Sequence, residues 1–147
     1  MPQTTEAELR KTLLRLNDVW FIKLQNAHFT KTPFDFLVIT PSLRVAIECK
    51  EVKSHLFPFS NFPEHQRQSL KTFKDKHPGL NRAYVLIRFK TFRNKTNTSF
   101  LIDIDKYMTL EQTLAVEGRR SFSKDYLLSL LKPLEDSKKR WDLTVYS

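Results

Sequence analysis

Cysteine and glycine are scarce in this sequence. Its single cysteine, Cys49, excludes an internal disulfide and fits a reducing compartment. One cysteine and 4 scattered histidines also lack the ligand spacing of a zinc site. Only 2 glycines among 147 residues leave little room for long flexible linkers. We therefore expect a single domain over residues 1–147.

Long apolar runs are absent as well. No run is long enough to cross a membrane, and the first residues lack an apolar signal segment. These absences predict a soluble, cytoplasmic protein with no membrane partner.

Acidic residues are outnumbered by basic ones. Lys and Arg total 25 against 16 Asp and Glu, which gives a net charge of +9 and a pI near 9.8. No single basic run accounts for this excess, so we expect a folded surface that meets a polyanion. Ribosomal and simple DNA-binding proteins share such a charge, so charge alone does not identify an enzyme.

The stretch that begins at Phe34 and reads FDFLVITPSLRVAIECK has the pattern of a β-hairpin. Two runs of β-branched and aromatic residues flank a turn in which Pro41 suits the second position. Symmetric pairing about this turn sets Asp35 opposite Glu48, and cross-strand partners on one face have Cβ atoms about 4.5–5.5 Å apart. The pattern therefore predicts two neighbouring carboxylates.

Strand alternation puts Asp35, Glu48 and Lys50 on one face of the hairpin, with Cys49 on the other. Both faces are otherwise apolar, and two buried carboxylates repel each other unless a cation or proton lies between them. Hard oxygen ligands favour Mg²⁺, with Mn²⁺ as a substitute. Lys50 would orient a water or stabilise developing negative charge. The alternative is a charge cluster that only stabilises the sheet.

The order of these residues resembles a known nuclease signature. Asp35, a spacer of 12 residues and then Glu48-Cys49-Lys50 are similar to the PD-(D/E)xK pattern, with Phe34 in place of its usual proline. The continuation EVK, followed by FPFSNFPEHQ at positions 57–66, resembles the segment after the catalytic strand of RecU-type Holliday junction resolvases. The later segment Gly118-Arg119-Arg120-Ser121 is also similar to that family.

This resemblance implies a fold, an activity and a set of roles. The fold is an α/β domain with a mixed central β-sheet flanked by helices, as in restriction endonucleases. The activity is metal-dependent cleavage of four-way DNA junctions by paired symmetric nicks, carried out by a homodimer without a small-molecule cofactor. Asp35, Glu48 and the backbone carbonyl of Cys49 would hold the metal, while Lys50 and Gln66 would orient the nucleophile and the scissile phosphate.

The sequence also departs from the RecU pattern. Too few residues separate Ile22 from Asp35 to form the long stalk of RecU proteins, so the chain more closely resembles compact archaeal resolvases. The small size fits a phage-encoded relative. Resolvases of this class often carry a carboxylate on the first helix, and Glu6 is a candidate for that position. The alternative is that Glu6 only favours the helix N-terminus.

Hydrophobic periodicity and capping residues predict the remaining elements. We expect helices over 5–16, 63–77, 109–118 and 123–131, and strands over 19–24, 82–92 and 99–104. The first and third of these helices begin with capping boxes at Thr5 and Thr109. On the second, Gln66 shares a stripe with Leu70 and Phe73 that faces the sheet.

Two further groups of residues are candidates for DNA contact. Lys53 and Arg67 would meet phosphates, or alternatively remain solvated. The aromatic residues Phe57, Phe59 and Phe62 would either stack on unpaired bases or anchor their loop to the core.

Two rival functions remain open at this point. The first is another endonuclease of the same fold that acts on flaps, ends or a recognition sequence. The second is a basic DNA-binding module that cuts nothing and whose carboxylates are structural.

Overall fold

The computed structural model describes residues 4–24, 32–90, 97–137 and 140–143. In chain order the elements are α1 (Thr5–Leu14), β1 (Trp20–Lys23), β2 (Phe36–Ile39), β3 (Arg44–Val52), β4 (Leu56–Pro58), the 3₁₀ turn η1 (Phe59–Asn61), α2 (Glu64–Lys76), β5 (Asn81–Phe89), β6 (Thr98–Asp103), α3 (Ile104–Val116), β7 (Ser121–Ser123), α4 (Lys124–Leu130), β8 (Asp136–Ser137) and β9 (Arg140–Trp141). The region in which a stalk would lie, between β1 and β2, falls largely outside the described residues.

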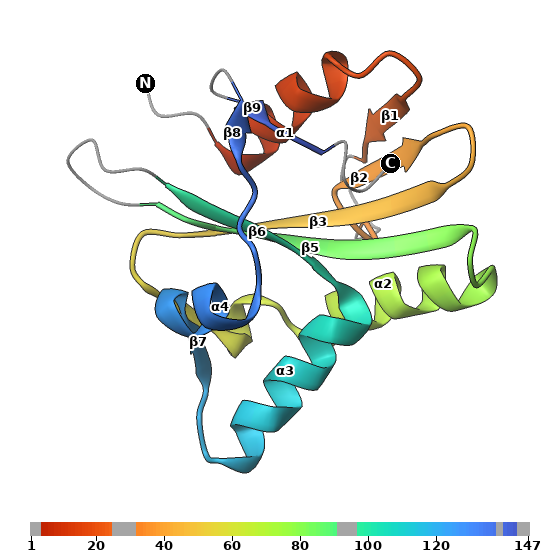
Figure 1. Cartoon of the computed structure of the whole chain (residues 1–147). Helices are drawn as coiled ribbons and strands as arrows, with labels where there is room; N and C mark the ends of the chain where they lie inside the picture. The colour runs from red at the N-terminus through yellow and green to blue at the C-terminus, as the bar shows by residue number, and fades with distance from the viewer. Residues whose placement is uncertain (1–3, 25–31, 91–96, 138–139, 144–147) are drawn as a thin grey trace.

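A five-stranded mixed sheet with the order β1-β2-β3-β5-β6 forms the centre of the fold (Figure 1). Strands β3 and β5 run parallel, and the other neighbours in this sheet are antiparallel. The hairpin has the predicted register, with Phe36 opposite Ile47 and Val38 opposite Val45. The predicted fold class, a mixed sheet flanked by helices, is confirmed.

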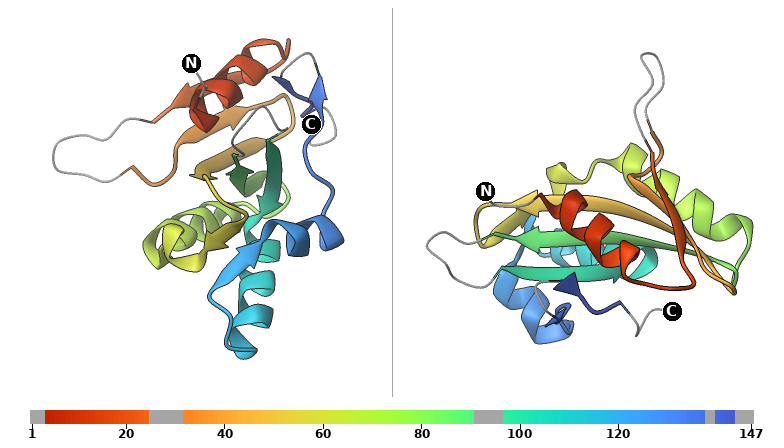
Figure 2. Two further views of the ribbon diagram at one scale, coloured as in Figure 1. Left: turned by 90° about the vertical axis from the view of Figure 1, so that its left-hand side faces the viewer. Right: turned by 90° about the horizontal axis from the view of Figure 1, so that it is seen from above.

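Each face of the sheet carries its own hydrophobic core. One core joins the sheet to α2, α3 and α4, and the other joins it to α1 and the C-terminal segment. The views from the side and from above show the same layers, with α1 on one side of the sheet and α2 to α4 on the other (Figure 2). Alternation in β3 decides which face each side chain enters, because Ala46 belongs to the first core and Ile47 to the second.

One predicted N-cap and one predicted helix start are wrong, although α1 begins at Thr5 as predicted. Thr4 caps α1, and its Oγ1 accepts a hydrogen bond from the N–H of Ala7, so the cap lies one residue before the predicted Thr5. Helix α3 begins at Ile104 rather than at Thr109, because Asp103 at the end of β6 accepts the N–H groups of Asp105 and Lys106. An aspartate at the N-cap position satisfies the free N–H groups of the first turn, so the chain passes directly from strand to helix.

Ion pairs connect α2 to the start of α3. Lys74 Nζ lies 2.7 Å from an oxygen of Asp103 and 2.6 Å from one of Asp105. Lys71 Nζ lies 2.7 Å from the other oxygen of Asp105. These contacts hold the two helices side by side beneath the sheet.

The α2–α3 contact predicts a stability that depends on pH. Hydrogen bonds from Lys71 and Lys74 hold the pKa of Asp105 below its ordinary value of 3.8. Because the folded pKa is lower than the unfolded one, the stabilisation is complete above the ordinary pKa and disappears as the pH falls through the folded one. We expect Asp105→Asn to lower the free energy of unfolding at neutral pH by at most about 1 kcal/mol, since solvent screens the pair.

Urea unfolding of both proteins at neutral pH and in strong acid measures this contribution. The two proteins should have equal stability in strong acid. A loss that persists there would show that the charge of Asp105 is not its cause.

Two contacts fix α1 against the opposite face of the sheet. The buried carboxylate of Glu8 lies 2.7 Å from the guanidinium of Arg88 on β5. The first turn is held by Glu51 on β3, whose Oε1 accepts the hydroxyl of Thr5 at 2.5 Å and its N–H at 3.2 Å. These contacts place the N-terminal turn of α1 at the end of β3.

No helix in the described ranges is long and apolar enough to cross a membrane.

Candidate active site

Asp35 and Glu48 meet at the open end of the β2–β3 hairpin. Regular pairing ends at Phe36, and the N–H of Asp35 donates to the carbonyl of Ile47 at 3.1 Å. One position further along, the Asp35 side chain replaces a backbone carbonyl as the acceptor: its Oδ2 accepts the N–H of Cys49 at 2.8 Å. This hydrogen bond turns the carboxylate toward Glu48, whose side chain contacts it through a further hydrogen bond. The two predicted carboxylates are therefore neighbours.

Burial and repulsion keep Glu48 protonated in the absence of a cation. Its side chain is 6% exposed. Burial, followed by the hydrogen bond and the charge of Asp35, raises the pKa of Glu48 to about 9, although the nearby Lys50 acts to lower it. Two carboxyl groups in contact need a proton or a cation between them, and a divalent cation would take the place of the proton.

Lys50 projects from the same face as Glu48. Its Nζ lies 5.9 Å from the ring centroid of Phe62, within the range of a cation–π contact. Phe62 is fully buried and packs edge-on against Tyr107 at 4.9 Å between ring centroids. The ammonium group thus contacts the Phe62 ring and lies near enough to Glu48 to act on its pKa.

Gln66 lies in the first turn of α2, on the helix face predicted from the sequence. One turn later, Leu70 is fully buried in the core between α2 and the sheet, and Phe73 packs against that core. The Oε1 atom of Gln66 is buried and has no hydrogen-bond partner among the described residues. A buried amide oxygen without a partner is able to accept a bond from a bound water or ligand.

The Cys49 side chain lies in the opposite core, as predicted from strand alternation. Burial, and then the charge of Asp35, raises the pKa of its thiol well above the ordinary value. The thiol therefore stays neutral and is neither a nucleophile nor a sulfur ligand. The predicted contribution of Cys49 to a metal site is its backbone carbonyl alone.

A second charged pair borders the site and was not predicted. Lys23 at the end of β1 lies 2.5 Å from Glu6 Oε2, and its pKa is raised chiefly by its hydrogen bond to Glu6, with a smaller contribution from Asp35. Both residues line an open pocket with Lys50 and Glu51. Glu6, the candidate carboxylate of the first helix, thus lies beside the site. Extending the antiparallel pairing to β1, where Lys23 pairs with Phe36, would have found Lys23 from the sequence.

The two predicted phosphate contacts lie in different environments. Lys53 is exposed just beyond β3. Arg67 forms an ion pair with Glu111 of α3, and its side chain is 22% exposed. A DNA phosphate that contacts Arg67 therefore has to bind beside the Arg67–Glu111 ion pair or displace Glu111 from it. The contact between Arg67 and DNA stays a prediction.

The aromatic residues of the segment after β3 pack in or against the hydrophobic core. Phe57 and Phe62 are fully buried, and Phe59 packs edge-on against Phe122 at 4.8 Å between ring centroids. This arrangement supports the anchoring role proposed for the loop over stacking on bases.

The donor set at the hairpin suits a hard divalent cation. Two carboxylates and a backbone carbonyl offer only oxygen ligands, which is the preference of Mg²⁺ and Mn²⁺. No cluster of three or more His, Cys, Asp or Glu side chains occurs in the part of the chain that the structure describes. Asp35, Glu48 and the backbone carbonyl of Cys49 are thus the groups that would hold such an ion.

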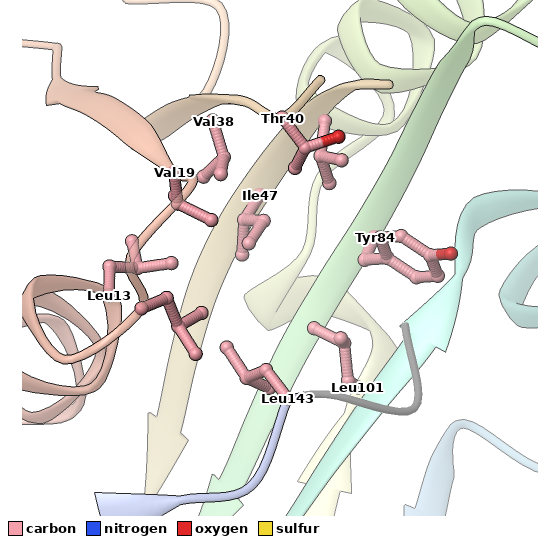
Figure 3. A pocket seen from close by; sticks show the side chains of 10 residues that line it. Leu13, Val19, Val38, Thr40, Ile47, Tyr84, Leu101 and Leu143 are labelled. Atoms are coloured by element: carbon pink, nitrogen blue, oxygen red, sulfur yellow. The ribbon is translucent and has the colours of Figure 1, made fainter. Parts of the chain in front are cut away.

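A separate apolar pocket lies on the opposite face of the sheet (Figure 3). Its lining has no acidic or basic side chain and consists of Leu13, Leu16, Val19, Val38, Thr40, Val45, Ile47, Tyr84, Leu101 and Leu143. Such a lining offers no carboxylate for metal chemistry.

A family model described as RecU, Recombination protein U, matches residues 16–140. The chain belongs to the RecU family. RecU proteins are Holliday junction resolvases, nucleases that hydrolyse DNA, so the predicted family and enzyme class are both confirmed.

The structure of this RecU protein is similar to that of Hjc from Archaeoglobus fulgidus, a Holliday junction resolvase from an archaeal hyperthermophile. The two sequences are 20% identical, the match covers 86% of this chain and 90% of Hjc, and the TM-score is 0.55. At this identity the similarity shows a shared fold. No curated protein sequence matches the chain.

Proposed function

We propose that this RecU protein resolves four-way DNA junctions by Mg²⁺-dependent hydrolysis at the β2–β3 hairpin. The contact between the carboxyl groups of Asp35 and Glu48 carries the proposal, because two acids in contact at the end of a buried hairpin need a cation or a proton. Family membership supports the reaction, and the oxygen-only donor set supports the metal.

Each side chain has a proposed role in phosphodiester hydrolysis. Asp35, Glu48 and the carbonyl of Cys49 would hold the divalent ion, which when bound would supply water activation and charge neutralisation at the phosphate. Lys50 stabilises the negative charge that develops on the phosphate. The unpartnered Oε1 of Gln66 accepts a hydrogen bond from the attacking water and orients it. Lys53 and Arg67 contact phosphates beside the scissile bond.

Paired nicks require two sites. A two-fold homodimer would place two hairpins on opposite strands of a symmetric junction, which matches protein symmetry to DNA symmetry. We include this homodimer and the single nuclease domain in the proposal. The cytoplasmic location and the phage origin expected from the sequence stay predictions.

Cleavage of a labelled synthetic four-way junction tests this function. We expect Mg²⁺ to produce two symmetric nicks that yield ligatable duplexes, Mn²⁺ to substitute, and excess EDTA to stop the reaction. Linear duplex and flap substrates of the same sequence should be cut at least tenfold more slowly, an order-of-magnitude threshold that separates structure-specific from general cleavage.

The same assay separates the rival functions. Preferential cutting of flaps, ends or one sequence in linear DNA would replace the resolvase by another endonuclease of this fold. Tight junction binding without cleavage of any substrate in either metal would leave a DNA-binding module.

A further inference from the structure

The two-stranded sheet formed by β4 and β7 brings together basic residues from two distant parts of the chain. Leu56 pairs with Ser123 and Pro58 with Ser121. Beyond each end of this sheet the contact continues, because Lys124 N donates to the carbonyl of His55 at 2.8 Å and Phe59 N donates to that of Arg120 at 2.9 Å. The segment after the catalytic strand therefore lies beside residues 120–124.

Neither segment contains a carboxylate. Residues 53–63 read KSHLFPFSNFP and residues 118–124 read GRRSFSK. Lys53, His55, Arg119 and Arg120 are exposed, and Lys124 is partly exposed. Their pairing concentrates positive charge on one short stretch of surface.

Three of these cations have no ion-pair partner in the described ranges. Lys53, Arg120 and Lys124 form no ion pair there, whereas Arg119 lies 4.0 Å from Glu117. We call Lys53, Arg120 and Lys124 the basic ridge. Three cations of α2, Arg67, Lys71 and Lys74, instead pair with carboxylates: Glu111, Asp75, Asp103 and Asp105. A cation that no carboxylate neutralises is the better partner for a phosphate.

The basic ridge is connected to the candidate active site by short, ordered segments. Lys53 follows Lys50 by three residues, which is about 10 Å of extended chain, or about three phosphate steps of a DNA strand. A second connection runs from β4 through η1 to Phe62, whose ring centroid lies 5.9 Å from the Nζ of Lys50. A DNA backbone that enters the hairpin site therefore reaches the ridge within a few nucleotides.

We infer that the basic ridge binds the phosphate backbone of the DNA arm next to the scissile phosphate. This inference rests on the proposed function for its ligand and adds Arg120 and Lys124, supplied by β7 and α4, to the DNA-binding surface. The contacts are made to phosphates and are therefore independent of base sequence.

The salt dependence of binding tests the ridge without any cleavage. Binding of the full chain to a labelled four-way junction is measured in EDTA over a series of salt concentrations. Each lost phosphate contact lowers the slope of log K against log salt by about 0.9. The double variant Arg120→Gln with Lys124→Gln should therefore lose about 1.8 in slope and bind between ten- and a hundredfold more weakly near 0.1 M salt.

Two control variants make the test specific. Lys11→Gln removes an exposed cation from α1, on the opposite face of the sheet, and should keep the wild-type slope. Lys124→Arg keeps the charge and should also keep the wild-type slope. All variants are compared with wild type by circular dichroism and thermal unfolding before binding is measured.

The outcomes separate this inference from the proposed function. The inference about the basic ridge would be overturned by a wild-type slope in the double variant, or by an equal reduction of the slope in Lys11→Gln. Either result would overturn it even if the wild-type protein cleaves junctions. A slope that is reduced in the double variant and unchanged in Lys11→Gln and Lys124→Arg would uphold it, even if no cleavage were found.

Discussion

Replacing Asp35 by asparagine is expected to abolish junction cleavage while leaving the fold intact. An asparagine Oδ1 can still accept the N–H of Cys49, and its amide can donate to Glu48. The variant lacks one of the two charges that would hold the cation. Losing several kcal/mol of metal-dependent stabilisation of the transition state corresponds to a rate on the order of a thousandfold lower.

Two measurements on Asp35→Asn distinguish a lost metal site from a lost structure. The first is the initial rate of nicking at saturating Mg²⁺. The second is the melting temperature with and without Mg²⁺, which should rise in wild type because the ion binds only the folded state, and stay unchanged in the variant. Asp105→Asn removes a carboxylate from the α2–α3 contact and should keep wild-type cleavage. A folded Asp35→Asn protein that nicks within tenfold of wild type would remove the hairpin from the mechanism, since the expected loss is about a hundred times larger.

Lys50→Met is expected to give the second largest effect. Methionine keeps an unbranched apolar stem over Phe62 but removes the charge that we propose stabilises the developing oxyanion. Loss of one such electrostatic group costs roughly 10²–10³ in kcat. Mg²⁺ binding should persist, because the carboxyl pair is unchanged, and so the melting temperature should still rise on addition of the ion.

Single-turnover cleavage with saturating protein measures the effect of Lys50→Met on the chemical step. Lys90→Met is the matched control, because Lys90 is also largely buried at a strand end but pairs with Glu51 at 3.3 Å. It should lower stability and keep the cleavage rate. If the Lys50→Met protein cleaves at the wild-type rate, the ammonium group has no part in the chemistry and its contact with Phe62 is structural.

The hairpin of the candidate active site could be predicted from the sequence because its determinants are local. A turn with Pro41 between two β-branched runs specifies the register, and strand alternation then assigns Asp35 and Glu48 to one face and Cys49 to the other. The helix phase of Gln66 was predictable for the same reason, since Leu70 and Phe73 recur at helical spacing. None of these steps requires knowledge of distant segments.

The capping errors at Thr5 and Thr109 have a different physical cause. A capping-box pattern is compatible with several neighbouring positions, and hydrogen-bond geometry selects among them. Asp103 is both the last residue of β6 and the N-cap of α3, and its carboxylate also accepts a hydrogen bond from Lys74. That contact depends on how α2 packs, which local patterns do not reveal.

The sequence by itself determined the register of the hairpin and the side chains that share its face, because the turn and strand alternation encode both. Its motifs, through their resemblance to RecU-type resolvases, indicated the family and the mixed sheet. Only the tertiary structure decided what surrounds them. It placed the ion pair of Glu6 and Lys23 beside the candidate site. It paired Arg67 with Glu111. Through the β4–β7 pairing it brought the segment that contains Lys53 next to the one that contains Arg120 and Lys124. These contacts join residues far apart in the chain, and packing of the sheet and helices brings them together.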